Sequence, residues 1–548
     1  MPEESSRRVS ELASQDLGDN RSSSVAQNAT RPVRPSYRRG WRLGAVSLAI
    51  FAFAFASRLP RCNDHIFLMD SADYVRAERN GFLTQYLGSD GISLVEFVRS
   101  RSAGGDFRLH PWSVLLDRGD GAALRHFHVP ASFYLYAIVE RLSGHPSADK
   151  ILTAAISSAT IALLCAIALV EGAPLAFAGA GAIVMGLCPA LIDAGTTMTP
   201  HALFSLAAIC AIATFACYQR TGRMEWLVAW VIATSIAMAT LEFSTLLIAT
   251  FVLMLGILFW QSRAVRERPF KLRTLLWALG GLVVCLFALW PAGFFRGGYV
   301  LSYGTLIFQG INRQREQRDL LATLSRLGSG HLWIGALYGV LLLMGIYGAL
   351  RNRRSVLIAT SAVYAALMFL EGKSNGFANP TYASHSIFAI VFLTMLTAPG
   401  LFDSARWPDK FAGSATICIL GLMVISYGWT AYRADPAEWT EEPSRVEGLI
   451  GKLEATYKPG TTFAVNMYAE PLTTYAPMFH FIPTQAGNNL SVPAWRDAGR
   501  HYLIINTKTL SDSDVGVCVK KQFTEGFWIS CDELPEAAGA SFNLPVGR

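Results

Sequence analysis

The chain has 548 residues, of which 52% are hydrophobic and 16% are charged, and its mean hydropathy is +0.33. The apolar residues stand in long blocks, which excludes an ordinary soluble protein and predicts an all-α polytopic membrane protein. The net charge of +7 lies largely in the N-terminal tail and in short loops between the blocks. There it sets membrane orientation and indicates no nucleic-acid partner.

Residues 1–39 are rich in Ser, Arg and Asn and contain almost no core-forming residues. They are predicted to be a disordered cytoplasmic tail and not a cleavable signal peptide. The basic run RPSYRRGWR (34–42) comes directly before the first apolar block, so it is expected to hold the N-terminus in the cytoplasm.

A spanning helix needs about 20 apolar residues, and we expect about 11–13 such helices within the membrane domain, residues 40–430. The candidate segments lie near 42–58, 129–143, 150–170, 174–191, 201–218, 225–241, 243–260, 274–295, 331–350, 355–370, 384–402 and 411–430.

Short basic loops predict the orientation of the spans. The loops at 219–223, 261–273 and 351–354, and the turn with Arg406 and Lys410, are expected in the cytoplasm. The first loop (59–128), loops 296–330 and 371–384, and the tail are then external. One conflict remains, because the N-terminus and 219–223 cannot both be cytoplasmic if every candidate spans. Either 129–143, the shortest, is re-entrant or interfacial, or the count is wrong elsewhere.

The tail, residues 433–548, is predicted to be a small extracytoplasmic domain of α/β or mostly β class. The runs TTFAVNM (461–467) and RHYLIIN (500–506) alternate like strands and are separated by Pro, Gly and Asn. Cys518 and Cys531 fall within one candidate hairpin, where an oxidising compartment would favour a disulfide. No CxxC pair occurs, which argues against a thiolate metal site.

Ionisable groups are costly within a bilayer, so they often mark a functional cavity. On the predicted topology Asp193, Glu242, His331, Glu371 and His385 lie at external ends of spans. Their common location predicts a polar cavity that opens outward. For each residue taken singly, the alternative is that the hydrated headgroup region at the end of the span accommodates its polar side chain.

The segment FLMDSADYVRAERNGF follows the first apolar block and contains two carboxylates. In a helix the spacing of three places Asp70 and Asp73 on one face, with Tyr74 close by. A carboxylate at the edge of the hydrocarbon can have its pKa raised and act as a general base. The alternative is an interfacial helix whose acids pair with Arg76 and Arg79.

The residues Asp70, Tyr74 and Ala77 resemble the "DE…Y…A" signature of the GT-C class glycosyltransferases, which include protein O-mannosyltransferases and aminoarabinose transferases. The segment HFHVPASFYLYAIVERLSG (126–144) resembles the block that closes the first external loop in that class. The resemblance covers roughly residues 40–430 and implies a GT-C-like fold.

The resemblance implies an inverting transfer of a sugar from a polyprenyl-phosphate donor to an acceptor hydroxyl outside the cytoplasmic membrane. Asp70 is carried over as the base, with Asp73 as a second candidate because Ser71 stands where the class has an adjacent acid. Glu242 stands where relatives often have Lys. The partners implied are the lipid-linked sugar and a glycan, lipid or protein acceptor, and the location implied for the chain is the cytoplasmic (inner) membrane.

Positive charge is needed for the leaving phosphate, and Arg296, Arg318 and Lys373 lie on the external side. The alternative for the neighbouring arginines, Arg313 and Arg315, is a solvated amphipathic helix. The predicted acceptor and substrate cavity comprises Tyr74, His126, His128, Glu242, Tyr382 and His385.

Three other functions stay open. A polysaccharide polymerase or O-antigen ligase also uses lipid-linked sugars, but its large catalytic loop is expected late in the span order. A transporter predicts paired broken helices in corresponding halves. A scaffold follows if Asp70 and Asp73 only pair with arginines. Some GT-C branches need a divalent metal, but the first loop has acids without a dense DxD cluster, so no metal or other cofactor is expected.

Overall fold

A computed structural model describes most of the apolar segments and parts of the C-terminal region. The described residues are 37–62, 86, 131–144, 147–241, 243–265, 272–295, 320–352, 355–374, 380–433, 436–465, 472, 474–483, 501–505, 520–525 and 528–533.

Within these residues, seven helices are long and apolar enough to cross a membrane, and one bent pair adds an eighth candidate. The seven are α3 (Tyr37–Ala56), α9 (Ala148–Val170), α12 (His201–Thr221), α19 (Leu332–Arg351), α20 (Val356–Ser374), α21 (Pro380–Phe402) and α22 (Trp407–Arg433). The bent pair is α10 (Leu175–Leu187) with α11 (Pro189–Thr196). Three further apolar helices are α13 (Met224–Met238), α14 (Ser244–Val265) and α15 (Leu272–Leu289). The prediction of a polytopic helical membrane protein is confirmed.

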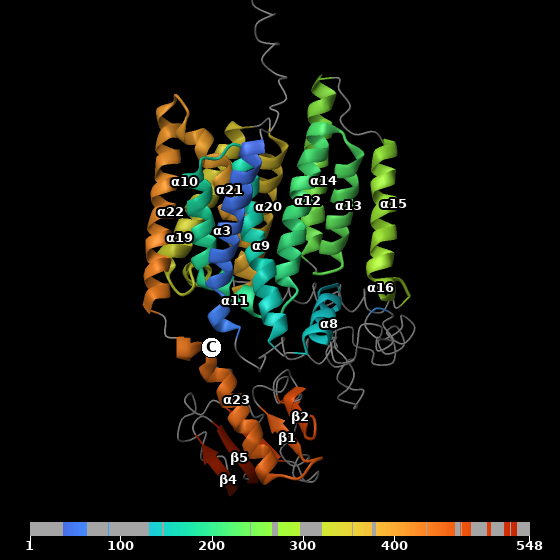
Figure 1. Cartoon of the computed structure of the whole chain (residues 1–548), viewed down its shortest axis with the longest axis vertical. Coiled ribbons are helices and arrows are strands. Elements are labelled where there is room, and N and C mark those ends of the chain that lie inside the picture. Colours follow the sequence, from blue (N-terminus) through green and yellow to red (C-terminus); the bar gives the residue numbers. More distant parts are fainter. Residues whose placement is uncertain are drawn as a thin grey trace, which may run out of the picture. The chain divides into compact units, whose positions relative to one another are not determined.

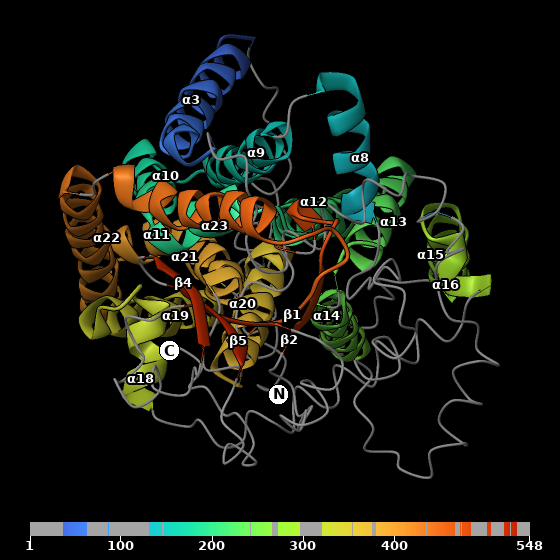
Figure 2. The same ribbon diagram turned by 90° about the horizontal axis from the view of Figure 1, so that it is seen from below.

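The helices from α9 to α22 run side by side as a bundle, and α8, α11 and α16 lie at one end of it (Figure 1). We call this end the α8 end. Seen along the bundle, α20 and α21 lie near the middle, with α19 and α22 to one side and α13 to α15 to the other (Figure 2). Most of the α21 side chains are buried, because this helix packs against α9, α10, α11, α19, α20 and α22.

Segment 129–143 does not form a span. It forms α8 (Ala131–Ser143), whose 13 residues measure about 20 Å, whereas the hydrocarbon core is about 30 Å thick. Without this segment the topology conflict disappears. When α13, α14 and α15 are counted as spans together with the seven long helices and the bent pair, four connections follow an even number of spans and therefore share one end of the bundle: α12–α13, α14–α15, α19–α20 and α21–α22.

Two other predicted spans are interrupted. The segment 174–191 bends by 62° between α10 and α11, where Cys188 is extended and Pro189 opens the second helix. Proline has no backbone N–H to donate to the carbonyl one turn earlier, so α10 ends before Pro189. The first turn of a helix tolerates proline, so α11 begins there. The segment 274–295 divides into α15 and the short helix α16 (Pro291–Phe295).

Small residues bring α19 and α21 close together. A Cβ added at Gly345 would lie 2.8 Å from Cδ2 of Leu393, and one added at Gly348 would lie 2.7 Å from Cβ of Thr397. Helices in a bilayer gain little from the hydrophobic effect between them, so such close van der Waals packing is a main source of their association.

A polar network joins α19 to the turn between α21 and α22 at the opposite end. Tyr347 Oη donates to Asp409 Oδ1 at 2.6 Å, and Ser404 Oγ donates to Asp409 Oδ2 at 2.8 Å. Arg351 Nη2 donates to Tyr347 Oη at 2.9 Å. The network fixes this short turn and satisfies the carboxylate of Asp409, whose residue is buried.

The C-terminal region contains a helix and a mixed sheet of order β2-β1-β3-β5-β4. The elements are α23 (Pro436–Thr456), β1 (Thr462–Val465), β2 (His480–Pro483), β3 (His501–Ile505), β4 (Lys520–Glu525) and β5 (Trp528–Glu533). β1 pairs in parallel with β2 and β3, whereas β5 pairs antiparallel with β3 and β4. The runs expected to be strands contain β1 and β3. The sequence reading did not anticipate α23.

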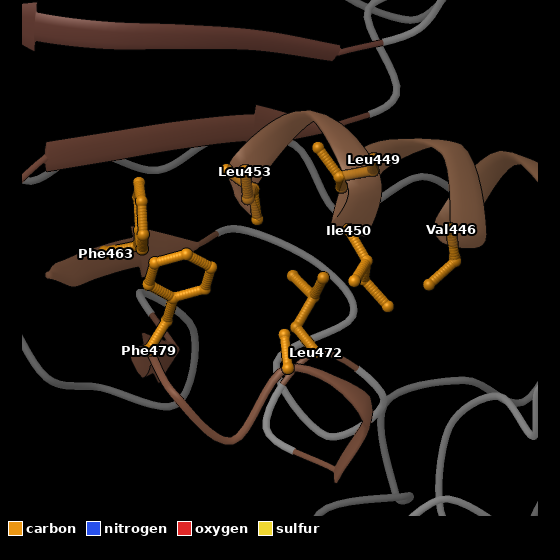
Figure 3. Packing of buried hydrophobic residues seen from close by; sticks show 8 residues of the cluster. Val446, Leu449, Ile450, Leu453, Phe463, Leu472 and Phe479 are labelled. Carbon is orange, nitrogen blue, oxygen red and sulfur yellow. The ribbon is translucent and has the colours of Figure 1, made fainter. Parts of the chain in front are cut away.

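The core of this region lies between α23 and β1. Figure 3 shows four α23 side chains directed toward Phe463, Leu472 and Phe479. They are Val446, Leu449, Ile450 and Leu453. Cys518 lies outside the described residues, so the disulfide with Cys531 stays a prediction.

Candidate functional site

Two buried histidines form the centre of a polar cluster at the α8 end. His201 is the first residue of α12, and His385 lies just over one turn into α21. Nδ1 of His201 lies 2.8 Å from Nε2 of His385, and Oγ of Ser205 lies 3.0 Å from Nδ1 of His385. The exposed fractions of His201, Ser205 and His385 are 7%, 5% and 2%. We call these three residues the histidine cluster.

Two hydrogen bonds hold the cluster together and tie α12 to α21. Nδ1 of His385 pairs with Oγ of Ser205, and Nε2 of His385 pairs with Nδ1 of His201, so both nitrogens of the buried His385 ring are hydrogen-bonded.

Aromatic rings enclose the cluster. Phe204 and Phe243 each meet the His385 ring nearly edge to face, with centroids 5.2 Å apart. Tyr382 meets the His201 ring at 6.0 Å and the Phe243 ring at 5.3 Å, both in T-shaped geometry. Such pairs hold the imidazoles in fixed orientations within an apolar wall.

Helix α8 is fastened beside this cluster. Tyr136 Oη lies 3.0 Å from Thr153 Oγ1 on α9 and donates to the carbonyl oxygen of Thr199 at 2.9 Å. Thr199 comes two residues before His201, so α8 braces the start of α12. The backbone N–H of Ala131 donates to the carbonyl of Ala239, which joins α8 to the end of α13.

Tyr86 is the one described residue between 63 and 130, the main part of the predicted first loop, and its contacts are at the α8 end. Tyr86 Oη donates to the carbonyl oxygen of Ala288 near the end of α15 at 2.8 Å, and its ring lies 5.8 Å from that of Tyr134 on α8. Burial raises the pKa of the Tyr134 phenol well above its usual range, so its hydroxyl stays protonated. Tyr86 thus links α8 to α15.

The end of the first span is anchored to the break between α10 and α11. Arg58 is fully buried, and its guanidinium donates to the carbonyl oxygens of Gly186 at 3.5 Å and Leu191 at 3.2 Å. Arg61 forms an ion pair with Asp193 on α11. The predicted first loop therefore begins from a fixed point at the α8 end.

The structure brings together two of the predicted cavity residues, Tyr382 and His385. Lys373 is exposed in the last turn of α20, at the same end of the bundle. The other predicted site residues lie outside the described residues: Asp70, Asp73, Tyr74, His126, His128, Glu242, Arg296 and Arg318.

The sequence analysis missed His201 and Ser205 as site residues. A signal was present, because the two stand four residues apart at the start of a span and therefore share one helix face. As for metals, no group of three or more His, Cys, Asp or Glu side chains in the described part of the chain could hold an ion.

Comparison with solved structures assigns the fold. The chain is similar to ArnT from Cupriavidus metallidurans bound to undecaprenyl phosphate, with a TM-score of 0.51 and 13% identity over 90% of this chain and 98% of that one. It is also similar to the oligosaccharyltransferase AglB from Archaeoglobus fulgidus, in complex with an inhibitory peptide and a dolichol-phosphate. There the TM-score is 0.51 and the identity 13%, over 86% of this chain and 70% of that one.

Both neighbours are GT-C glycosyltransferases. The chain has a GT-C fold. No family model and no curated protein sequence matches it, so the likeness is one of structure. The GT-C-like fold expected from the sequence is thereby confirmed.

Proposed function

We propose that the protein is an inverting glycosyltransferase that moves a sugar from a polyprenyl-phosphate donor to an acceptor hydroxyl on the outer side of the cytoplasmic membrane. The observation that carries this proposal is the shared fold over 90% of the chain with ArnT, whose structure holds undecaprenyl phosphate. The AglB structure likewise holds a lipid phosphate. A GT-C fold with a buried polar cluster at one end suits a reaction at the boundary of lipid and water.

In the proposed reaction Asp70 removes the proton of the acceptor hydroxyl. The acceptor oxygen attacks the anomeric carbon, and the bond from that carbon to the phosphate oxygen breaks. The electron pair leaves with the lipid phosphate, and the anomeric configuration inverts. Asp73 is the second candidate for the base.

Lys373 is proposed to contact the donor phosphate, because it is exposed in the last turn of α20, at the end of a candidate membrane span. Arg296 and Arg318 are proposed to complete this site with guanidinium contacts. His385 and Tyr382 are proposed to border the acceptor, together with Tyr74, His126, His128 and Glu242.

The proposed orientation is based on the basic loops. Their shared end of the bundle is proposed to be cytoplasmic, which places the N-terminus inside and the α8 end and C-terminal region outside. In a cysteine-free background, Arg326→Cys in α18 (Leu320–Leu327) should react with an impermeant thiol reagent on intact cells. Arg223→Cys, in the α12–α13 turn, should react only after permeabilisation. Both positions are exposed, and the reverse labelling pattern would refute the orientation.

The proposed function is tested by sugar transfer with the purified chain in liposomes. Polyprenyl-phosphate sugars extracted from membranes serve as donors, and labelled sugar on extracted envelope acceptors is the readout. We expect transfer that continues in EDTA, since the proposal requires no metal ion. Absence of transfer with all donors would contradict the proposed function, and loss in EDTA would contradict the metal-free mechanism.

One observation bears on the transporter alternative. The break between α10 and α11 is the kind of discontinuous span that transporters place at a binding site. Transporters carry such breaks in matching halves, and α10–α11 is the only bent pair of this kind among the described helices. The glycosyltransferase is therefore the function we propose.

A further inference from the structure

We infer that Tyr475 is a positioning residue, whose ring couples the C-terminal region to α8 and, through α8, to the start of α12. In this role it holds the acceptor side of the proposed site in alignment with the predicted first loop, which carries the proposed base Asp70. The inference rests on the proposed function and assigns the C-terminal region a part in it.

Tyr475 packs against two separate hydrophobic clusters. One is the core of the C-terminal region, which Figure 3 shows between α23 and β1. The other lies in the membrane domain, and we call it the α8 cluster. Its members are Phe133 and Tyr136 on α8 and Met198 shortly before α12, with exposed fractions of 0%, 1% and 0%. One partly buried side chain therefore joins the two cores.

The C-terminal region makes a second contact with the membrane domain. Helix α23 packs against the short 3₁₀ helix η1 (Leu59–Arg61), which opens the predicted first loop. Helix α8 follows the end of the same loop. Relative motion of two parts of a chain is the default, and contacts on two separate elements restrict it more than one contact would. The C-terminal region thus braces the elements on both sides of the loop that carries Asp70.

A continuous line of contacts leads from the α8 cluster to the histidine cluster. Tyr136 donates from Oη to the carbonyl oxygen of Thr199 at 2.9 Å. Pro200 follows as the N-cap of α12, and its ring fixes φ, so this link is stiff. The first turn of α12 pairs with His385, which is proposed to border the acceptor. A displacement of α8 is therefore expected to move the acceptor side of the proposed site.

The alternative is that Tyr475 only covers apolar surface. Such a contact would change stability and leave the rate per folded molecule unaltered. Helix α8 has 13 residues, a length at which an isolated helix is marginal, so its position depends on its neighbours. One of the residues that Tyr475 covers, Tyr136, is also the residue that holds the start of α12. A misplacement of about 1 Å can lower a rate by about 10²-fold, so this contact affects catalysis as well as stability.

The first test measures sugar transfer by variants of the full chain in liposomes, well below the melting temperature of each. Polyprenyl-phosphate sugars extracted from membranes are the donors. Tyr475→Ala should lower kcat by about 10–100-fold, with the donor KM changed less than about 3-fold. Tyr475→Phe keeps the ring and should stay within about 3-fold of wild type. The matched control is Met478→Ala, in the same stretch of chain but exposed and outside both clusters, which should behave as wild type.

A double-mutant cycle locates the effect. If Tyr475 acts through the α8 cluster, Tyr475→Ala combined with Met198→Ala should lose no more than about 3-fold beyond the more affected single variant. Losses that multiply would show that the two side chains act independently, which contradicts the proposed route. Thermal unfolding of every variant is measured beside kcat, because a merely structural role would lower the melting temperature without changing kcat.

The contact itself is tested without the reaction. A benzophenone amino acid in place of Tyr475 should, on illumination of intact membranes, cross-link to peptides that contain α8 or Met198. The same amino acid in place of Met478 should not. Absence of the cross-link from position 475 would overturn the inference.

Two further outcomes would overturn it while leaving the proposed function intact. One is transfer by Tyr475→Ala with kcat within about 3-fold of an active wild type. The other is a Tyr475→Phe variant as slow as Tyr475→Ala, because the ring would then not be what acts. If the wild type transfers no sugar from any donor, the proposed function itself fails, and the positioning role fails with it whatever cross-links form.

Discussion

Asp70→Asn is expected to reduce sugar transfer by about 10²–10⁴-fold, the range that a general base contributes. Asparagine has the shape of aspartate but cannot accept the proton of the acceptor hydroxyl at neutral pH. The donor KM should change little, because the carboxylate acts on the acceptor. The measurement is initial-rate transfer in liposomes at matched amounts of folded protein.

Asp73→Asn is the matched control for this result. Asp73 lies three residues away and has the same chemistry, but Asp70 is the acid that fits the signature with Tyr74 and Ala77. We therefore expect Asp73→Asn to retain more than about a tenth of the activity. If Asp73→Asn alone is inactive, the base is Asp73. If both variants transfer sugar as well as wild type, the carboxylates are structural, and the transporter or scaffold becomes the better explanation.

Hydropathy predicted most spans correctly because the bilayer leaves few alternatives. A segment of apolar residues in lipid must hydrogen-bond its own backbone N–H and C=O groups. A helix does this, and about 20 helical residues cross the hydrocarbon core. The same criterion failed for 129–143, since a 13-residue apolar helix can pack at the end of a bundle without crossing it. For 174–191 the warning was Pro189, which marks the start of α11 inside the apolar block.

The site was predicted less completely, for a physical reason. His385 could be selected because a polar residue near the end of a span is costly and conspicuous. His201 meets the same criterion and was missed, but its pairing with His385 could not be predicted, because that contact depends on how α12 and α21 pack. Nothing local in either segment encodes that contact. Lys373 was likewise located by its position at a span end, but its distance from a bound phosphate depends on the substrate.

Gly335→Ala is expected to lower the free energy of unfolding by about 1–3 kcal/mol, the usual cost of overpacking. Gly335 lies on α19 where α18 crosses it, and an added Cβ would lie 2.6 Å from the carbonyl carbon of Leu324 and even closer to its oxygen. These are backbone atoms of α18, so no side-chain rotation relieves the overlap. The two helices must separate, which exposes Leu327, a residue that is fully buried.

Gly339→Ala is the control within the same helix, because a Cβ there meets nothing within 4 Å. It should be neutral or stabilise by up to about 1 kcal/mol, since alanine favours helix more than glycine does. Thermal unfolding of both variants in one detergent separates the clash from the change in helix propensity. Equal melting temperatures would show that α18 does not pack on α19 as described. A lower melting temperature for Gly335→Ala alone would confirm that α18 packs on α19. Helix α18 belongs to the predicted loop 296–330, which also carries Arg296 and Arg318.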